Sequence, residues 1–349
     1  SRPLWGLVPL WAGGGSAPFY RLFLTAPDGT VSRWRWDEWG FTKEETAVSF
    51  VVFGDNLLHE PIYRYALNHD GDFGFLYENI TDIIAKSDVA VINQETPLVD
   101  NPAQYGGYPR FGTPVQAGQA LVSAGFDVVT CATNHMLDRG AEGAYFTREF
   151  FASRGVVCMG IRTKEDAESC PYEIIVRNGI RFALFNYTYG TNGLKPPKDN
   201  PYILPLLDDK ERVGRELTEA REEADFVIVF AHWGTEYGEE ADEFQKTWTQ
   251  VFLEGKADVV VGSHPHALQP YEMLRDGDGH EMLVYYSIGN YVSAQDEESC
   301  IKGGMAAFTV SLTAAGYRVT AYSLEPLVIT RGEGGRYGVR QAASANPPR

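Results

Sequence analysis

The sequence predicts an α/β fold with a largely parallel inner sheet. Short apolar runs alternate with longer amphipathic segments through most of the chain, and Gly or Pro stands at many of the boundaries. Late in the chain, the apolar runs at 306–312 and 317–327 follow each other directly, which predicts antiparallel strands in a second, mixed sheet. With 349 residues, 44% of them hydrophobic, the chain can bury the core of one large domain or two modest ones.

The first half of the main region supplies four strands and three helices. In chain order, we expect a strand at 48–53, a helix at 60–68, strands at 89–92 and 126–131 with a helix at 114–124 between them, a helix at 141–154 and a strand at 156–159. The helix at 114–124 has the clearest ends, because Pro114 suits a first helical position and Gly125 suits the stop.

The second half continues the alternation. Strands are expected at 172–176, 181–187, 226–230, 258–261 and 282–286, and helices at 208–224 and 241–254. Asn178-Gly179 lies between the first two of these strands and is a strong signal for a two-residue hairpin turn.

Composition divides the chain into three parts. Residues 1–45 are rich in Trp, Gly and Pro and are expected to form an N-terminal extension that packs on a main domain at 46–330. Residues 331–349 are expected to be a C-terminal tail. No run of eighteen apolar residues predicts a membrane span, and because the chain starts at Ser1, a signal or anchor could have been removed.

Charge and cysteine content exclude several classes of function. The net charge of −17 argues against nucleic acid as a partner, because phosphate binding depends on Lys and Arg. None of the four cysteines forms a C-x-x-C motif, which disfavours a zinc ribbon or a thioredoxin-like site. Cys158 and Cys170 could pair, but the sequence does not decide this.

Five apolar runs each end in residues that can bind a metal. These are Asp55, Glu95, Asn134 with His135, His232, and His264 with His266. The carboxyl ends of parallel strands meet at one edge of a sheet, so these side chains should gather there. Oxygen and imidazole donors suit divalent ions such as Zn, Mn or Fe. The pattern therefore predicts a metal site.

Each ligand also has a plainer explanation. Asp55 could be a turn residue, Asn134 a helix cap and His232 a packed core histidine. Glu95 is the hardest to explain without a ligand, because a carboxylate at the end of a buried strand needs a partner.

Six short motifs in the chain together resemble those of a known family. The motifs are Gly54-Asp55, Asn93-x-Glu95, Ala132-Thr-Asn134-His135-x-x-Asp138-x-Gly140, His232-Trp-Gly-x-Glu236-Tyr237, Gly262-Ser-His264-Pro-His266 and Ser287-x-Gly289-Asn290. The chain resembles the poly-gamma-glutamate capsule synthesis (CapA) family over about 49–327, a family similar to the calcineurin-like metallophosphoesterases.

The resemblance implies a four-layer α/β/β/α sandwich of the metallophosphoesterase type with a binuclear metal centre. It implies that Glu95 bridges the two ions. Asn134, His232 and His264 would complete the coordination of one ion, and Asp55 and His266 would complete the coordination of the other. His135 would be the proton donor, oriented by Asp138.

The first motif departs from the phosphoesterase pattern. Leu57 stands where a histidine is expected, and His59 is the only nearby substitute. Occupancy by one or by two ions therefore stays open, with Mn, Zn or Fe as the expected metals.

Four further residues are candidates for substrate binding. Arg110 could clamp an anion or could be an ordinary surface arginine. Glu236, Tyr237 and Asn290 could line the pocket or only brace it.

The expected function is a metal-dependent hydrolase of the cell envelope or exterior. Its substrate would be the anionic polymer poly-gamma-glutamate, a related peptide or a phosphoester, attacked by a water whose pKa the metal lowers. Two alternatives remain: a non-hydrolytic component of capsule assembly or export, and a metal-dependent peptide epimerase that uses His135 for proton transfer. The net charge of −17 favours a small substrate or one held by metal over a long polyanion.

Overall fold

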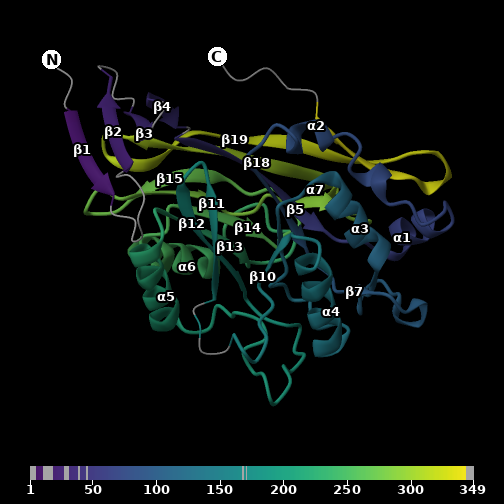
Figure 1. Cartoon of the computed structure of the whole chain (residues 1–349). Helices are drawn as coiled ribbons and strands as arrows, with labels where there is room; N and C mark the ends of the chain where they lie inside the picture. The colour runs from purple at the N-terminus through teal and green to yellow at the C-terminus, as the bar shows by residue number, and fades with distance from the viewer. Residues whose placement is uncertain are drawn as a thin grey trace.

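Two β-sheets packed face to face, with helices on both outer faces, make up the main domain (Figure 1). The computed structural model describes residues 5–10, 19–26, 31–37, 40–44, 46–166, 169 and 171–342, with the backbone alone described for those among 5–22 and 35–44. Cys170 and residues 343–349 therefore lie outside the described residues.

The first sheet has eight strands. Its order is β10 (Val157–Met159), β9 (Val128–Thr130), β6 (Val89–Gln94), β5 (Ala47–Asn56), β18 (Lys302–Thr313), β19 (Gly316–Arg331) and β20 (Tyr337–Gln341), and β17 (Asn290–Val292) also pairs with β5. The strands from β10 to β5 are parallel, whereas β18, β19 and β20 are antiparallel. The sheet extends past the domain boundary expected at 330, because β20 pairs with β19.

The second sheet has six strands. Its order is β11 (Tyr172–Arg177), β12 (Ile180–Thr188), β13 (Phe226–His232), β14 (Val259–Ser263), β16 (Glu281–Tyr285) and β15 (Tyr271–Arg275). The four central strands are parallel, and the two edge strands are antiparallel to their neighbours. Asn178 and Gly179 both have positive φ, at 48° and 72°, as the hairpin turn between β11 and β12 requires.

Helices cover the outer face of each sheet. The helices are α1 (Glu60–Leu67), α2 (Thr81–Ile84), α3 (Val115–Ala124), α4 (Gly140–Ala152), α5 (Lys210–Glu223), α6 (Glu243–Glu254) and α7 (Glu298–Ile301). The apolar faces of α1, α3 and α4 pack on the first sheet, and those of α5 and α6 on the second. No helix in the described part of the chain is long and apolar enough to span a bilayer.

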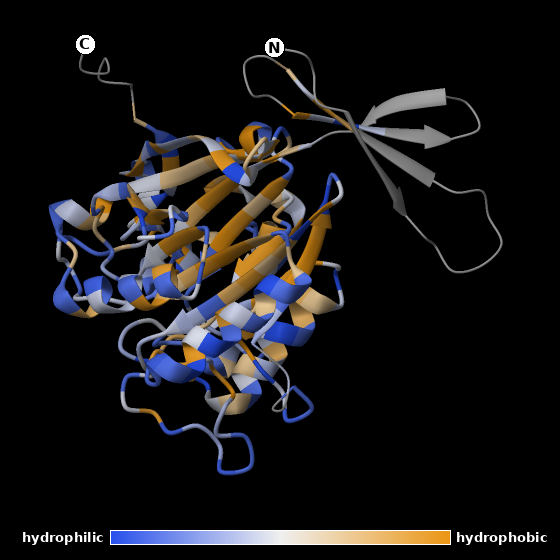
Figure 2. Cartoon of the chain, turned by 90° about the vertical axis from the view of Figure 1, so that its left-hand side faces the viewer, coloured by the Kyte–Doolittle hydropathy of each residue, from blue (hydrophilic) through white to orange (hydrophobic). Residues whose placement is uncertain are grey.

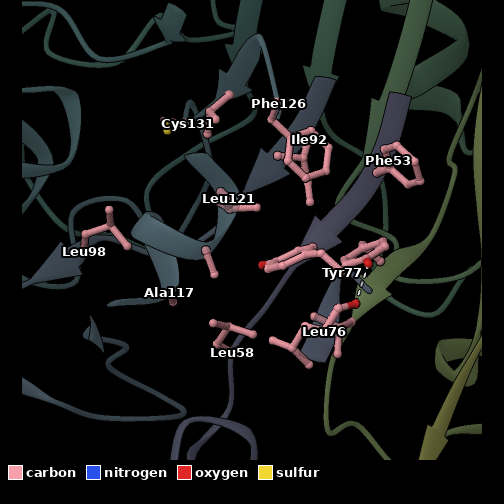
Figure 3. Packing of buried hydrophobic residues seen from close by; sticks show 14 of the residues in the cluster. Phe53, Leu58, Leu76, Tyr77, Ile92, Leu98, Ala117, Leu121, Phe126 and Cys131 are labelled. Atoms are coloured by element: carbon pink, nitrogen blue, oxygen red, sulfur yellow. Dashed lines mark hydrogen bonds between the residues drawn. The ribbon is translucent and has the colours of Figure 1, made fainter. Parts of the chain in front are cut away.

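Three apolar cores hold the four layers together. The middle core joins the inner faces of the two sheets, where Phe50 packs on Phe182 with ring centroids 5.0 Å apart. The core under α3 contains Phe53, Ile92 and Leu121 (Figure 3). Figure 2 shows hydrophobic strands enclosed by helices that carry hydrophilic residues. The α/β/β/α sandwich is therefore confirmed.

Capping residues set the helix ends close to where the sequence predicts them. Gly125 ends α3 with φ of 94°. Asp242 accepts from the backbone of Gln245, whose side chain accepts in return from the Asp242 backbone, so α6 begins two residues later than expected. Asp209 caps α5 in a similar way, through the Arg212 N–H.

The region before the main domain forms a separate four-stranded antiparallel sheet. Its strands are β1 (Trp5–Leu10), β2 (Phe19–Thr25), β3 (Val31–Asp37) and β4 (Gly40–Glu44). The Arg33 guanidinium donates to the Tyr317 hydroxyl at 3.2 Å and to the Asn178 carbonyl at 2.7 Å, which ties β3 to the main domain. A two-stranded pair, β7 (Leu98–Val99) and β8 (Thr113–Pro114), completes the described strands.

Candidate metal centre

The predicted ligands meet where the parallel strands of both sheets end. The first sheet supplies Asp55 from β5, Glu95 directly after β6 and Asn134 from the loop after β9. The second sheet supplies His232 at the end of β13 and the His264–His266 pair after β14. All six side chains are buried. The site therefore lies across the seam between the two sheets.

Glu95, His264 and His266 lie at the centre of this cluster. One ligand atom from each lies within 4.8 Å of the others. The Glu95 Oε1 atom is 3.7 Å from His266 Nε2 and 3.8 Å from His232 Nε2. Both carboxylate oxygens of Glu95 and the Nδ1 of His264 are buried without a hydrogen-bond partner. Buried polar atoms are nearly always paired with another polar atom. These three unpaired atoms can each donate an electron pair to a metal, so they fit a bound divalent cation.

Asp55 is already engaged by protein donors. Its Oδ1 accepts from the Asn93 amide at 2.7 Å, and its Oδ2 lies 3.2 Å from the His264 backbone N–H and 3.0 Å from His266 Nδ1. His266 Nδ1 also lies 3.0 Å from Asn290 Oδ1. A carboxylate on one ring nitrogen fixes the tautomer and turns the other toward the cation. Here Asp55 directs His266 Nε2 toward Glu95.

His232 and Asn134, two further predicted ligands, contact each other. His232 Nε2 lies 2.8 Å from Asn134 Oδ1, and His232 Nδ1 lies 2.9 Å from the Ser263 hydroxyl. Ser263 therefore orients the His232 ring, as Asp55 orients the His266 ring.

Burial and charge shift the proton affinities of the cluster. Burial raises the pKa of Glu95 well above its usual range, and Asp55 and Glu236 add to the effect while His266 opposes it. Burial lowers the pKa of both His232 and His264 well below normal, which keeps them neutral and able to bind metal. Burial alone would also lower the pKa of His266, but Glu95 and Asp55 outweigh it and raise the value to about 9.

Close backbone packing places the ligands. A Cβ on Gly54 would overlap the Gly289 carbonyl, and one on Gly262 would overlap the Tyr286 carbonyl, so both positions need glycine. His264 and His266 have φ of 94° and 59°, a left-handed backbone that costs energy for a side chain with a Cβ. This turn brings both imidazoles to the same site.

His135 and Asp138 form the predicted acid pair. His135 Nδ1 lies 2.8 Å from Asp138 Oδ2, which also accepts from the Phe111 backbone N–H at 2.8 Å. The Phe111 ring packs edge-on against His135, with centroids 4.8 Å apart. The carboxylate and the ring together fix the orientation of the imidazole.

The predicted substrate residues have different positions. Asn290 is buried behind His266, and its amide donates to Ser293 and Gln295, so it braces the ligand. Glu236 is exposed, yet its charge raises the pKa of Glu95, which places it near the site. The Tyr237 ring lies 6.4 Å from that of His266. The side chain of Arg110 is exposed, and its backbone carbonyl accepts from Arg139.

Leu57 stands where the phosphoesterase pattern has a histidine, and the structure shows the surroundings of this position. Leu57 is buried, and its backbone N–H donates to the Val292 carbonyl. His59 packs on Phe111, and its Nδ1 lies 3.2 Å from the Leu57 carbonyl and 3.3 Å from the Ala294 backbone nitrogen. Burial lowers the pKa of His59 to about 4. His59 therefore lies beside the cluster with one ring nitrogen already engaged.

Sequence reasoning missed three residues that shape the site. Phe111 orients His135, while Tyr189 and Asn192 come from the loop after β12. The Tyr189 ring lies 4.5 Å from that of His264, and burial, Glu236 and Glu95 raise its pKa to about 12. Asn192 accepts from the Asn134 amide at 3.2 Å. All three come from loops, where neither periodicity nor a ligand-type side chain marks them.

Comparison with known proteins identifies relatives in capsule synthesis. The PGA biosynthesis protein CapA of Bacillus subtilis is 27% identical over 260 residues, covering 73% of this chain and 65% of that protein. The capsule biosynthesis protein CapA of Bacillus anthracis is 25% identical over 261 residues, covering 72% of this chain and 61% of that protein. The chain thus matches less than two thirds of the length of either relative.

Similar solved structures include two phosphoesterase-type proteins. A phosphatase from Mycoplasma pneumoniae is 14% identical with a TM-score of 0.47, covering 81% of this chain and 94% of its own. The calcineurin-like phosphoesterase YfkN from Bacillus subtilis is 12% identical with a TM-score of 0.43, covering 80% and 90%.

A family match spans the entire ligand set. Residues 49–295, more than half of the chain, match the family described as "Bacterial capsule synthesis protein PGA_cap". This range begins before Asp55 and ends after Asn290. The chain therefore belongs to the bacterial capsule synthesis protein family PGA_cap.

Proposed function

We propose that this protein is a metal-dependent hydrolase of the cell envelope or exterior. Its substrate is a phosphoester or an amide of the poly-gamma-glutamate type. The observation that carries the proposal is the pair of unpartnered Glu95 oxygens beside neutral histidines at the seam of the two sheets. Leaving these atoms without a ligand would be costly, so the cluster is best explained by a cation.

The chain's own residues provide the rest of the chemistry. Glu95, His264 and His266 would hold the cation, with His232, Asn134 and Asp55 beside them. A divalent cation in that position supplies a Lewis acid and lowers the pKa of a water molecule. His135 is held by Asp138 at 2.8 Å and can deliver a proton to the leaving group.

Metal analysis and hydrolysis assays test this proposal. Protein loaded with Mn²⁺ or Zn²⁺ should retain at least one ion after desalting and should hydrolyse p-nitrophenyl phosphate or poly-gamma-glutamate. His264→Ala should lose both properties, whereas His69→Ala, which changes an exposed histidine of similar chemistry, should keep them. Protein that retains no metal would contradict the proposal.

A non-hydrolytic part in capsule synthesis is the second candidate. It is favoured by the names of the Bacillus relatives, which describe biosynthesis rather than cleavage. Protein that binds metal and poly-gamma-glutamate but cleaves neither substrate would favour this candidate.

Exchange of solvent deuterium into a peptide α-carbon without cleavage would instead identify an epimerase.

A further inference from the structure

The loop that follows β12 crosses the metal centre and is fixed at its base. The Tyr189 backbone N–H donates to the His232 carbonyl at 2.9 Å. At the other end of the loop, the Leu207 N–H donates to the Thr188 carbonyl at 2.9 Å. The first residue of the loop therefore stands beside a predicted ligand, on the second sheet's side of the seam.

Tyr189 lies between the ligand cluster and solvent. Its ring packs 4.5 Å from that of His264, while 37% of the residue remains exposed. Its hydroxyl donates to Asn192 Oδ1 at 3.4 Å. The phenol is therefore in contact with a predicted ligand and also open to solvent.

Asn192 holds this phenol in place. The turn at Asn192-Gly193 has φ of 50° and 73°, and the Thr191 hydroxyl closes it by donating to the Leu194 carbonyl at 2.6 Å. Leu194 packs against the core under the first sheet. Because Asn192 Oδ1 also accepts from the Asn134 amide, one side chain links the phenol to a predicted ligand.

The Tyr189 hydroxyl could stabilise negative charge on a substrate at this site. Among the described residues, no ion pair joins a Lys or Arg to Glu95, Asp55 or Asp138. Hydrolysis of a phosphoester or an amide places negative charge on an oxygen of the attacked group, and a fixed donor stabilises that charge. A phenol has an ordinary pKa near 10, is protonated at neutral pH, and adds no charge.

We propose that Tyr189 is a catalytic residue that donates a hydrogen bond to the substrate oxygen that gains negative charge, and that Asn192 is its positioning residue. The inference rests on the proposed hydrolase function. The phenol keeps its proton throughout and exchanges one acceptor, Asn192 Oδ1, for the substrate oxygen, so a hydrogen bond is exchanged and no covalent bond of the tyrosine forms or breaks. The bond that is cleaved and the proton delivered by His135 are unchanged.

Tyr189→Phe removes only the hydroxyl and is the direct test, with Tyr202→Phe as a matched control. Tyr202 lies on the same loop and is 63% exposed. In Mn²⁺-loaded protein with p-nitrophenyl phosphate, Tyr189→Phe should lower kcat about 100-fold, as expected for one lost oxyanion donor, and leave KM within about threefold. Metal content and Tm should not change, and Tyr202→Phe should behave like the unmodified protein.

Binding of orthovanadate provides a readout that does not depend on turnover. Vanadate mimics the five-coordinate phosphorus of the reaction, so Tyr189→Phe should weaken its binding in calorimetry at least tenfold. The affinity for inorganic phosphate should change less. Asn192→Ala should lower kcat by a smaller factor, and in the double variant the two losses should combine to less than their product, because part of the Asn192 effect acts through the Tyr189 hydroxyl and part through Asn134.

The outcomes separate this inference from the function on which it rests. Metal-loaded protein that hydrolyses nothing would overturn the hydrolase and Tyr189's role together. Active protein whose kcat and vanadate affinity survive Tyr189→Phe would overturn the role of Tyr189 alone. Loss of metal in Tyr189→Phe would also overturn it, since the tyrosine would then support the ligands rather than the reaction.

Discussion

Glu95→Gln should leave the metal-free protein about as stable as the unmodified one while removing its response to metal. Glu95 is fully buried, both of its oxygens lack a hydrogen-bond partner, and the nearest imidazole nitrogens are 3.7 and 3.8 Å away. Without a cation, the chain carries the cost of a buried carboxyl group. Glutamine has nearly the same shape and carries no charge.

The magnitudes follow from this geometry. An unpaired buried polar group costs about 1–3 kcal/mol, and glutamine carries this cost as the glutamate does. Because burial raises the pKa of Glu95 and so already disfavours its charged form, we expect Glu95→Gln to change the free energy of unfolding in EDTA by less than about 1 kcal/mol. With free metal at a hundred times Kd, the unmodified protein should gain about 2.7 kcal/mol from binding, and Glu95→Gln should gain almost none.

Urea unfolding followed by tryptophan fluorescence measures both effects. Each protein is unfolded in EDTA and in Mn²⁺, and His69→Ala serves as the control that should respond to metal normally. A Glu95→Gln protein that metal stabilises as much as the unmodified one would refute the ligand role. A loss of more than 1 kcal/mol in EDTA would refute the reasoning about buried charge.

Three further predictions concern the proton balance and packing. The pKa of His266, raised to about 9, means that this imidazole keeps its proton at neutral pH in the metal-free protein, and the raised pKa of Glu95 also favours bound protons at the site. Metal must displace them, so calorimetry with Mn²⁺ should show affinity rising from pH 6 to pH 8 by up to about tenfold per unit for each proton released. An affinity independent of pH would contradict this. Gly262→Ala should cost about 3 kcal/mol in urea unfolding, because its Cβ would overlap the Tyr286 carbonyl, whereas Gly277→Ala meets no atom within 4 Å and should change stability little. Leu121→Ala should cost about 2–5 kcal/mol through a cavity under α3, and a cost no greater than that of Val176→Ala, at a residue 50% exposed, would show that this core is loosely packed.

Periodicity predicted the central architecture because burial on both faces leaves a strong mark. Strands β6 and β14 begin with continuous apolar runs, at 89–92 and 259–261, and each is followed directly by a predicted metal ligand, Glu95 or His264. The helix ends followed from local chemistry at Gly125 and Asp242, which is the same in any fold. Strand direction predicted that these residues would gather at one edge of a sheet, whereas in the structure they come from the ends of strands in both sheets.

The parts that escaped prediction depend on contacts distant in sequence. The strands β1 to β4 lie in a segment whose Trp, Gly and Pro content obscured the alternation typical of strands. The polar strand β20 is a strand because β19 offers it an edge. Tyr189 and Asn192 could not be recognised as residues near the site from the sequence, because only the fold of the loop after β12 brings Tyr189 against His264. The placement of Asp55 as a hydrogen-bond partner of His266 likewise depends on the turn at His264 and His266.

The division of the ligand set between two sheets has a consequence for how the protein could be inactivated. Each sheet carries three of the six predicted ligands, so the complete set forms only where the two sheets meet, and metal affinity should depend on how the sheets are registered against each other. A slight slip at Phe50 and Phe182, whose rings meet 5.0 Å apart in the middle core, would spread the ligands while leaving every one of them intact. Damage deep in the apolar interior would then appear first as a loss of metal, before any loss of fold.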